Sequence, residues 1–129
     1  MEVNRYDGQG RPVINNLVVE KELVVGGKVF LDTSIPEVTI SSGAITVTSS
    51  LHKVDTESND ATDDLETING GAVGQLLLIR AANDARTVVA KDNTGNLRLA
   101  GDFSLDGAKD SLFLWFDGNQ WAEISRSSN

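Results

Sequence analysis

From Val38 onward, apolar and polar residues alternate with the two-residue period of a β-strand. Residues 44–48 are the clearest example, with Ile45 and Val47 on one face and hydroxyl side chains on the other. Asn, Asp and Gly separate such runs, and these residues adopt turn conformations at low cost. The pattern predicts strands at residues 38–40, 44–48, 51–54, 75–81, 86–91, 96–100, 103–105, 111–116 and 121–125.

Strands of this length and spacing, with turn signals between them, are typical of all-β folds. Residues 116–121 give the best hairpin signal, and no stretch has the pattern of an amphipathic helix. The sequence therefore predicts an all-β protein with a small β-sandwich or barrel-like domain over residues 37–129.

The stretch 63–78 joins an acidic run to the most apolar predicted strand. A single helical or 3₁₀ turn would point its two large apolar residues inward, and glycines would then turn the chain into the strand. Both tryptophans, Trp115 and Trp121, fall in the hairpin and are expected in or near the core. The predicted fold anchors are Leu65, Ile68, Gly70, Gly71 and Trp121.

Residues 1–36 have a different pattern, and we interpret them as an N-terminal arm. A polar leader over residues 1–12 precedes a Leu- and Val-rich segment that ends at two glycines, with a further short strand predicted at 28–31. A short isolated β-ribbon is marginal in water and needs another sheet or chain to cover it. A cyclic homo-oligomer would provide that cover. The predicted partner-binding residues are Val13, Ile14, Leu17, Val18, Val19, Leu23, Val24 and Val25.

Charge narrows the choice of partners. The formal net charge is −8, and the Lys and Arg residues form no cluster. Nucleic acids and anionic membranes are bound by clustered basic residues, so neither is an expected partner. No apolar run reaches the 18–20 residues or so that span a bilayer, and the N-terminal residues lack the basic region and apolar run that would predict a secretion signal.

The acidic run 55–66 carries oxygen ligands at positions 1, 3, 5, 9 and 12 of a calcium-binding EF-hand loop. These are Asp55, Glu57, Asn59, Asp63 and Glu66. Position 6 of such a loop is Gly, but here it is Asp60, and no flanking helices are predicted. A solvated acidic loop is the simpler interpretation, so no metal ion or cofactor is predicted.

Nothing in the sequence predicts an enzyme. Cysteine is absent, and His52 is the only histidine. Its neighbours Ser49 and Ser50 lie on the same predicted strand segment, and no nucleophile-elbow motif is present. We therefore expect His52 to lie at the surface or in an interface.

Taken in order, several short motifs of residues 43–126 resemble a domain of tailed-bacteriophage virion proteins. That group includes capsid decoration proteins, also called cement or head-fibre proteins, and the tips of tail fibres. The motifs are ITVTSSLH at 45–52, DLETINGG at 64–71 with Gly74, RTVV at 86–89, GNLRLAGDF at 95–103, and DG at 117–118 before WAE at 121–123.

The resemblance implies an all-β, usually trimeric protein with a structural role and no catalytic residue. Residues 1–42, ahead of the matched region, suit a capsid-binding foot better than a fibre shaft. We therefore expect a decoration protein, made in the host bacterial cytoplasm and displayed on the virion capsid surface. It would bind itself as a homotrimer and, through the partner-binding residues of the arm given above, the major capsid protein. The alternative is a receptor- or glycan-binding tail-fibre tip.

Overall fold

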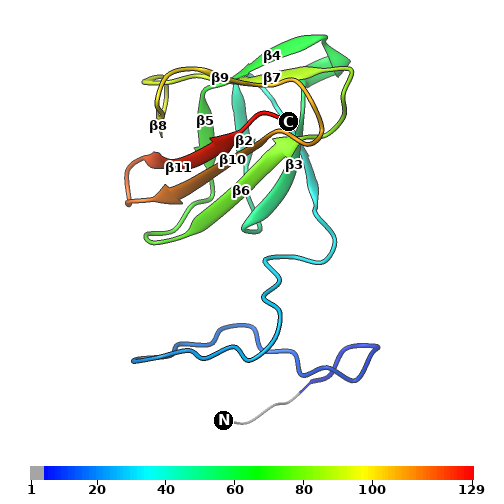
Figure 1. Cartoon of the computed structure of the whole chain (residues 1–129), viewed down its shortest axis with the longest axis vertical. Coiled ribbons are helices and arrows are strands. Elements are labelled where there is room, and N and C mark those ends of the chain that lie inside the picture. The colour runs from blue at the N-terminus through cyan, green and yellow to red at the C-terminus, as the bar shows by residue number, and fades with distance from the viewer. Residues whose placement is uncertain (1–4) are drawn as a thin grey trace.

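The computed structural model describes residues 5–129, which form two unlike parts (Figure 1). Residues 37–129 form a β-domain that contains all the strands of the described chain. Residues 5–36, the arm, extend away from this domain as an irregular trace. Residues 1–4 of the predicted leader lie outside the described residues.

The domain is all-β, as predicted. Its strands form a six-stranded sheet in the order β1-β3-β6-β10-β11-β8, a two-stranded sheet β2-β5, and a three-stranded sheet β4-β7-β9. One short 3₁₀ helix, η1 (Glu57–Asn59), interrupts them. The strands are β1 (Glu37–Thr39), β2 (Ala44–Thr46), β3 (Leu51–Asp55), β4 (Thr62–Leu65), β5 (Thr67–Asn69), β6 (Leu76–Ala81), β7 (Thr87–Ala90), β8 (Leu97–Arg98), β9 (Phe103–Leu105), β10 (Ser111–Phe116) and β11 (Trp121–Ser127).

Strands far apart in the sequence pair in a regular order. β2 runs parallel to β5, with Ile45 opposite Ile68. β3 runs parallel to β6, and β4 runs parallel to β7. Each strand from β2 to β4 therefore lies beside the third strand after it, and the chain winds through two three-sided coils, β2-β3-β4 and β5-β6-β7.

This winding is that of a β-solenoid, and it corrects the expectation of a sandwich or barrel. Period-two alternation identifies strands and their buried faces, but it does not identify their partners. Hairpin turns favour antiparallel neighbours, whereas here bends between consecutive strands lead the chain around a coil. The coil then brings distant strands together in parallel.

The C-terminal strands close the second coil with antiparallel pairs. β9 adds to β7, with Val88 opposite Leu105, and β10 adds to β6, with Ile79 opposite Leu112. β11 returns along β10 in the predicted hairpin, where Phe116 lies opposite Trp121. These strands cover two edges that the second coil would otherwise leave open to pairing with other chains.

Three of the predicted fold anchors, Ile68, Gly71 and Trp121, lie together in the core. Leu65, Ile68 and Trp121 are buried, and the Trp121 indole N–H donates to the Ile68 carbonyl at 3.1 Å. A Cβ on Gly71 would lie 2.6 Å from the Trp121 ring, so this glycine permits the packing. Gly70 has a φ of +87° and no room for a Cβ beside the Val47 carbonyl.

The expected helical turn between Leu65 and Ile68 is wrong. Leu65 ends β4 and Ile68 lies in β5, with a corner of the coil between them. At that corner the amides of Glu66 and Thr67 both donate to the Gly43 carbonyl, at 2.8 and 3.1 Å. The prediction of a solvated loop over 55–66 is also wrong in part, because β4 lies within it.

The short strands predicted in the arm are not formed. Within residues 5–36, the pairing is limited to one isolated antiparallel bridge between Tyr6 and Pro12. The β-branched residues of 13–31 favour extended backbone, but extended segments become a sheet only when a partner accepts their hydrogen bonds. A single chain does not supply that partner.

Candidate functional site

The arm exposes an unusual concentration of large apolar side chains. The two Leu-Val-Val triplets, Leu17–Val19 and Leu23–Val25, are both exposed, and Val18 and Val24 reach 84% and 85%. A second apolar run, Val29–Leu31, is also exposed. Small soluble proteins seldom expose contiguous apolar surface unless it binds a partner. Of the predicted partner-binding residues, only Val13 is half-buried.

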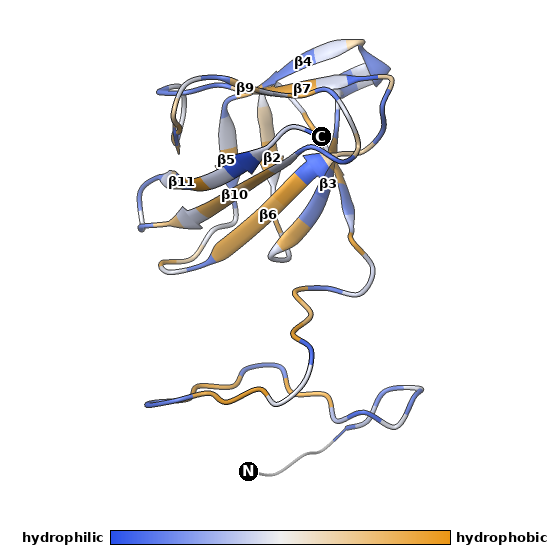
Figure 2. Cartoon of the chain, viewed as in Figure 1, coloured by the Kyte–Doolittle hydropathy of each residue, from blue (hydrophilic) through white to orange (hydrophobic). Residues whose placement is uncertain are grey.

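The backbone of the arm is as uncovered as its side chains. Residues 14–35, all within the described chain, make no backbone-to-backbone hydrogen bond. The chain bends at Glu20 and Lys21, and Figure 2 shows an apolar run on each side of this polar tip. Free N–H and C=O groups beside apolar side chains are what a segment needs to add to another sheet or chain.

The arm is tied to the domain at its C-terminal end. The Pro36 carbonyl accepts hydrogen bonds from the Lys53 amide at 3.1 Å and from the His52 ring at 3.0 Å. Further out, the Ser49 hydroxyl donates to Asp32 at 2.7 Å. Hydrogen bonds from the Ser34 amide and the Ser49 hydroxyl lower the pKa of Asp32 to about 2, so Asp32 is charged at neutral pH.

His52 is fully buried, which corrects the expectation of a surface or interface histidine. Its Nε2 accepts hydrogen bonds from the Thr48 and Ser49 amides, each at 3.1 Å. The proton therefore sits on Nδ1, which donates to Pro36. Both ring nitrogens are engaged by backbone groups, so the geometry gives His52 a role in anchoring the arm.

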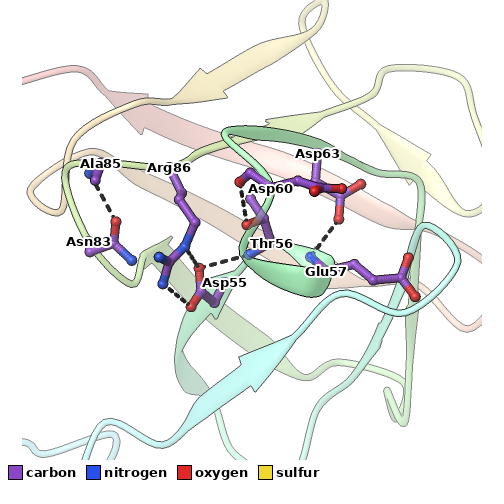
Figure 3. A network of polar contacts seen from close by, with 8 residues as sticks. All are labelled: Asp55, Thr56, Glu57, Asp60, Asp63, Asn83, Ala85 and Arg86. Carbon is purple, nitrogen blue, oxygen red and sulfur yellow. Dashed lines mark hydrogen bonds and ion pairs between the residues drawn. The ribbon is translucent and has the colours of Figure 1, made fainter.

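The acidic run does not gather its carboxylates around one point. Asp55 forms a two-point ion pair with Arg86, at 2.7 and 2.6 Å (Figure 3). The hydrogen bonds from Arg86 lower the pKa of Asp55 below its usual value. An arginine occupying both oxygens leaves Asp55 no free ligand for a cation.

The other candidate metal ligands have local structural roles. Asp63 accepts the Glu57 amide at 2.8 Å, and the Glu57 carboxylate accepts the Ser42 amide at 3.2 Å. Asn59 is exposed, and Glu66 lies along Gly43. Within residues 5–129, no three His, Cys, Asp or Glu side chains are close enough together to hold a metal ion.

A second uncovered surface lies on the outer face of the six-stranded sheet, and we call it the outer patch. Register places Leu51, Leu78 and Phe113 in one row across β3, β6 and β10. Leu76, Trp115 and Ala122 form the next row, across β6, β10 and β11. All six are exposed or half-buried.

The sequence did not predict this patch. Trp115, expected in or near the core with Trp121, instead lies in the outer patch between Leu76 and Ala122 and is 42% exposed. Residues 76–79 form an unbroken apolar run, so their alternation between core and solvent is hidden in the sequence. Only the pairing with β3 and β10 shows that Leu76 and Leu78 belong to the outer face.

No helix among residues 5–129 is long and apolar enough to cross a membrane. No protein-family model matches the chain, and a search of curated proteins finds no match.

Proposed function

We propose that this chain is a non-enzymatic structural protein of a tailed-bacteriophage virion. It decorates the head as a cement or head-fibre protein, with the arm as its attachment segment. The observation that supports this role most directly is the exposed, unpaired apolar arm tied to a closed β-domain. An arm of this kind has no evident use in an isolated monomer.

The solvent-accessible surface area of the chain also supports a role for the arm in binding a partner. The chain exposes 8037 Å². A compact monomer of its mass, 13.8 kDa, exposes about 6,600 Å². The excess, about 1,400 Å², is more than the roughly 800 Å² that one partner contributes to a standard protein–protein interface. A binding segment that is solvated until it meets its partner accounts for such an excess.

In the proposed assembly the protein is a homotrimer seated where major capsid subunits meet. The arms lie along the head surface, and the β-domains project outward. Burial of apolar arm residues across several capsid subunits stabilises the head by mass action, because the arms bind only the assembled lattice. The acidic character of the chain, with net charge −8, is unfavourable for contact with packaged DNA and suits an external position.

The test is to express the chain with a phage head lattice and to locate it on purified particles. The expected result is co-sedimentation with heads in many copies and labelled density over the whole head surface. Density confined to the tail would replace this proposal with a receptor- or glycan-binding fibre tip. Complete absence from particles would remove the virion role.

A paired variant tests the role of the arm. Val29→Asp with Leu31→Asp places two charges in an exposed run of the arm. We expect this variant to bind heads at least about tenfold more weakly while keeping the fold of the domain. Val73→Asp, at an exposed apolar position on a turn of the domain, is the matched control and should bind normally.

A further inference from the structure

The chain carries two uncovered apolar surfaces that differ in form. One is the arm tip, residues 17–25, with a triplet on each side of Glu20-Lys21-Glu22. The other is the outer patch, a sheet face. A Leu-Val-Val triplet in extended conformation is about 10 Å long. The distance across the patch from β3 to β10, two strand spacings, is also about 10 Å.

The two surfaces have complementary charges. On the outer face of the sheet, register places Lys53, Arg80 and Arg98 around the apolar rows. The acidic strand residues at this edge are Glu37 and Asp55, and Asp55 is paired with Arg86. None of the three basic residues forms an ion pair within residues 5–129. In a chain with net charge −8, this is an unusually basic face.

The arm tip has more acidic than basic residues. Glu20 and Glu22 flank a single lysine at the bend, and neither glutamate has an ion-pair partner in the described chain. A tip that lies across the outer patch with its bend toward Lys53 and Arg80 would place acidic groups beside basic ones. Complementary charges of this kind favour one orientation and suppress wrong partners.

We propose that the arm tip of one copy packs on the outer patch of a second copy. This inference rests on the proposed function in taking the arm as an assembly segment, and it names the partner of its tip. Because the tip and the patch are different surfaces, the contact is head-to-tail, and it closes as a ring when the rotation between neighbouring copies completes a full turn. In the homotrimer proposed above, the ring has three copies. Val13, Ile14 and residues 29–31 lie outside the tip and are left to contact the phage head.

The experiment uses two full-length variants that each lose one surface. Val18→Asp with Val24→Asp damages the tip, at its two most exposed apolar residues. Leu76→Lys with Trp115→Lys damages the patch, where both side chains are more than 40% exposed. Sedimentation velocity gives the masses, and circular dichroism checks that each variant keeps the fold. Val73→Lys, on an exposed turn outside both surfaces, is the control.

We expect the native chain and the control to sediment as oligomers, and each variant alone as a monomer of 13.8 kDa. Mixing the two variants should restore a one-to-one complex, since one supplies an intact tip and the other an intact patch. No other pairing of these surfaces predicts that result.

Each other outcome overturns the proposal in an identifiable way. A tip variant that still self-associates would indicate contact between patches, and a patch variant that does so would indicate contact between tips. A monomeric native chain would mean that the tip is free or folds back on its own domain. These measurements use no phage heads, so their failure is separate from any failure of head binding.

Discussion

The side-chain amide of Asn96 pairs with both backbone polar groups of Ile68. Its Oδ1 accepts the Ile68 amide at 2.9 Å, and its Nδ2 donates to the Ile68 carbonyl at 2.8 Å. A neighbouring strand would make the same pair of bonds with β5. Asn96 therefore ends the two-coil solenoid on this side by substituting for the strand of a third coil.

Replacing Asn96 with Asp tests this pairing. The carboxylate keeps an acceptor for the Ile68 amide but turns a second acceptor toward the Ile68 carbonyl. We expect the free energy of unfolding to fall by about 2 kcal/mol at neutral pH, measured by urea denaturation. Asn83→Asp is the control, because Asn83 uses only its oxygen, which accepts the Ala85 amide at 2.9 Å. Equal losses in both variants would contradict the interpretation.

The Asp55–Arg86 pair should make stability depend on acid pH. Arg86 lowers the pKa of Asp55 in the folded state, below the ordinary value of 3.8. The stabilisation is therefore fully present above pH 3.8 and is lost as pH falls through the lower folded-state pKa. Asp55→Asn should lower the urea midpoint at neutral pH.

The difference between the native chain and Asp55→Asn should narrow as pH falls toward about 2, because acid also neutralises Asp55 in the native chain. Asp7→Asn is the matched control, since the Asp7–Arg11 pair lies in the exposed arm. It should leave the midpoint unchanged. A gap between native chain and Asp55→Asn that stays constant across this range would show that the ion pair is not its cause.

Two glycines with positive φ should respond differently to alanine. A Cβ on Gly95 would lie 2.1 Å from the Glu66 carbonyl oxygen, whereas a Cβ on Gly74 would meet no atom within 4 Å. Gly74→Ala therefore costs only the left-handed backbone, about 1–2 kcal/mol. Gly95→Ala adds a clash with backbone and should cost more than about 4 kcal/mol. Thermal unfolding followed by circular dichroism compares them, and similar costs would contradict the close approach.

Limited proteolysis should separate the arm from the domain. Trypsin is expected to cut first after Lys21 and Lys28, in backbone without hydrogen-bonded partners, and to leave a stable fragment that begins at Val29. Mass spectrometry identifies the fragments. If arms pack on neighbouring copies, cleavage should slow as protein concentration rises. Early cleavage after Lys53 or Arg80 would show that the domain is less stable than its paired strands imply.

The sequence predicted strands better than it predicted their arrangement. Strands β6, β7, β9, β10 and β11 lie within two residues of the predicted bounds, because alternation and turn residues are local signals. The solenoid order depends on parallel pairs such as Leu65 with Ala90, which no local signal specifies. Asn96 is the first residue of the strand predicted at 96–100, so its role as a strand substitute becomes visible only beside Ile68.

The candidate site was also predicted only in part from the sequence. The apolar residues of the arm could be identified because they form contiguous runs without the turn chemistry of a closed fold. The burial of His52 could not be predicted, because its three hydrogen-bonding partners come from the arm junction and from the turn before β3. The outer patch depends on sheet register, and the sequence alone does not specify that register.

The point where the arm joins the domain also determines how the molecule would carry a mechanical load. The arm continues directly into β1, which runs parallel to β3. A pull on the arm along the direction of β1 therefore loads the β1–β3 hydrogen bonds together, as shear. The bonds from His52 and Lys53 to Pro36 lie first in the path of that force. Such a joint resists tension better than an edge that peels one bond at a time.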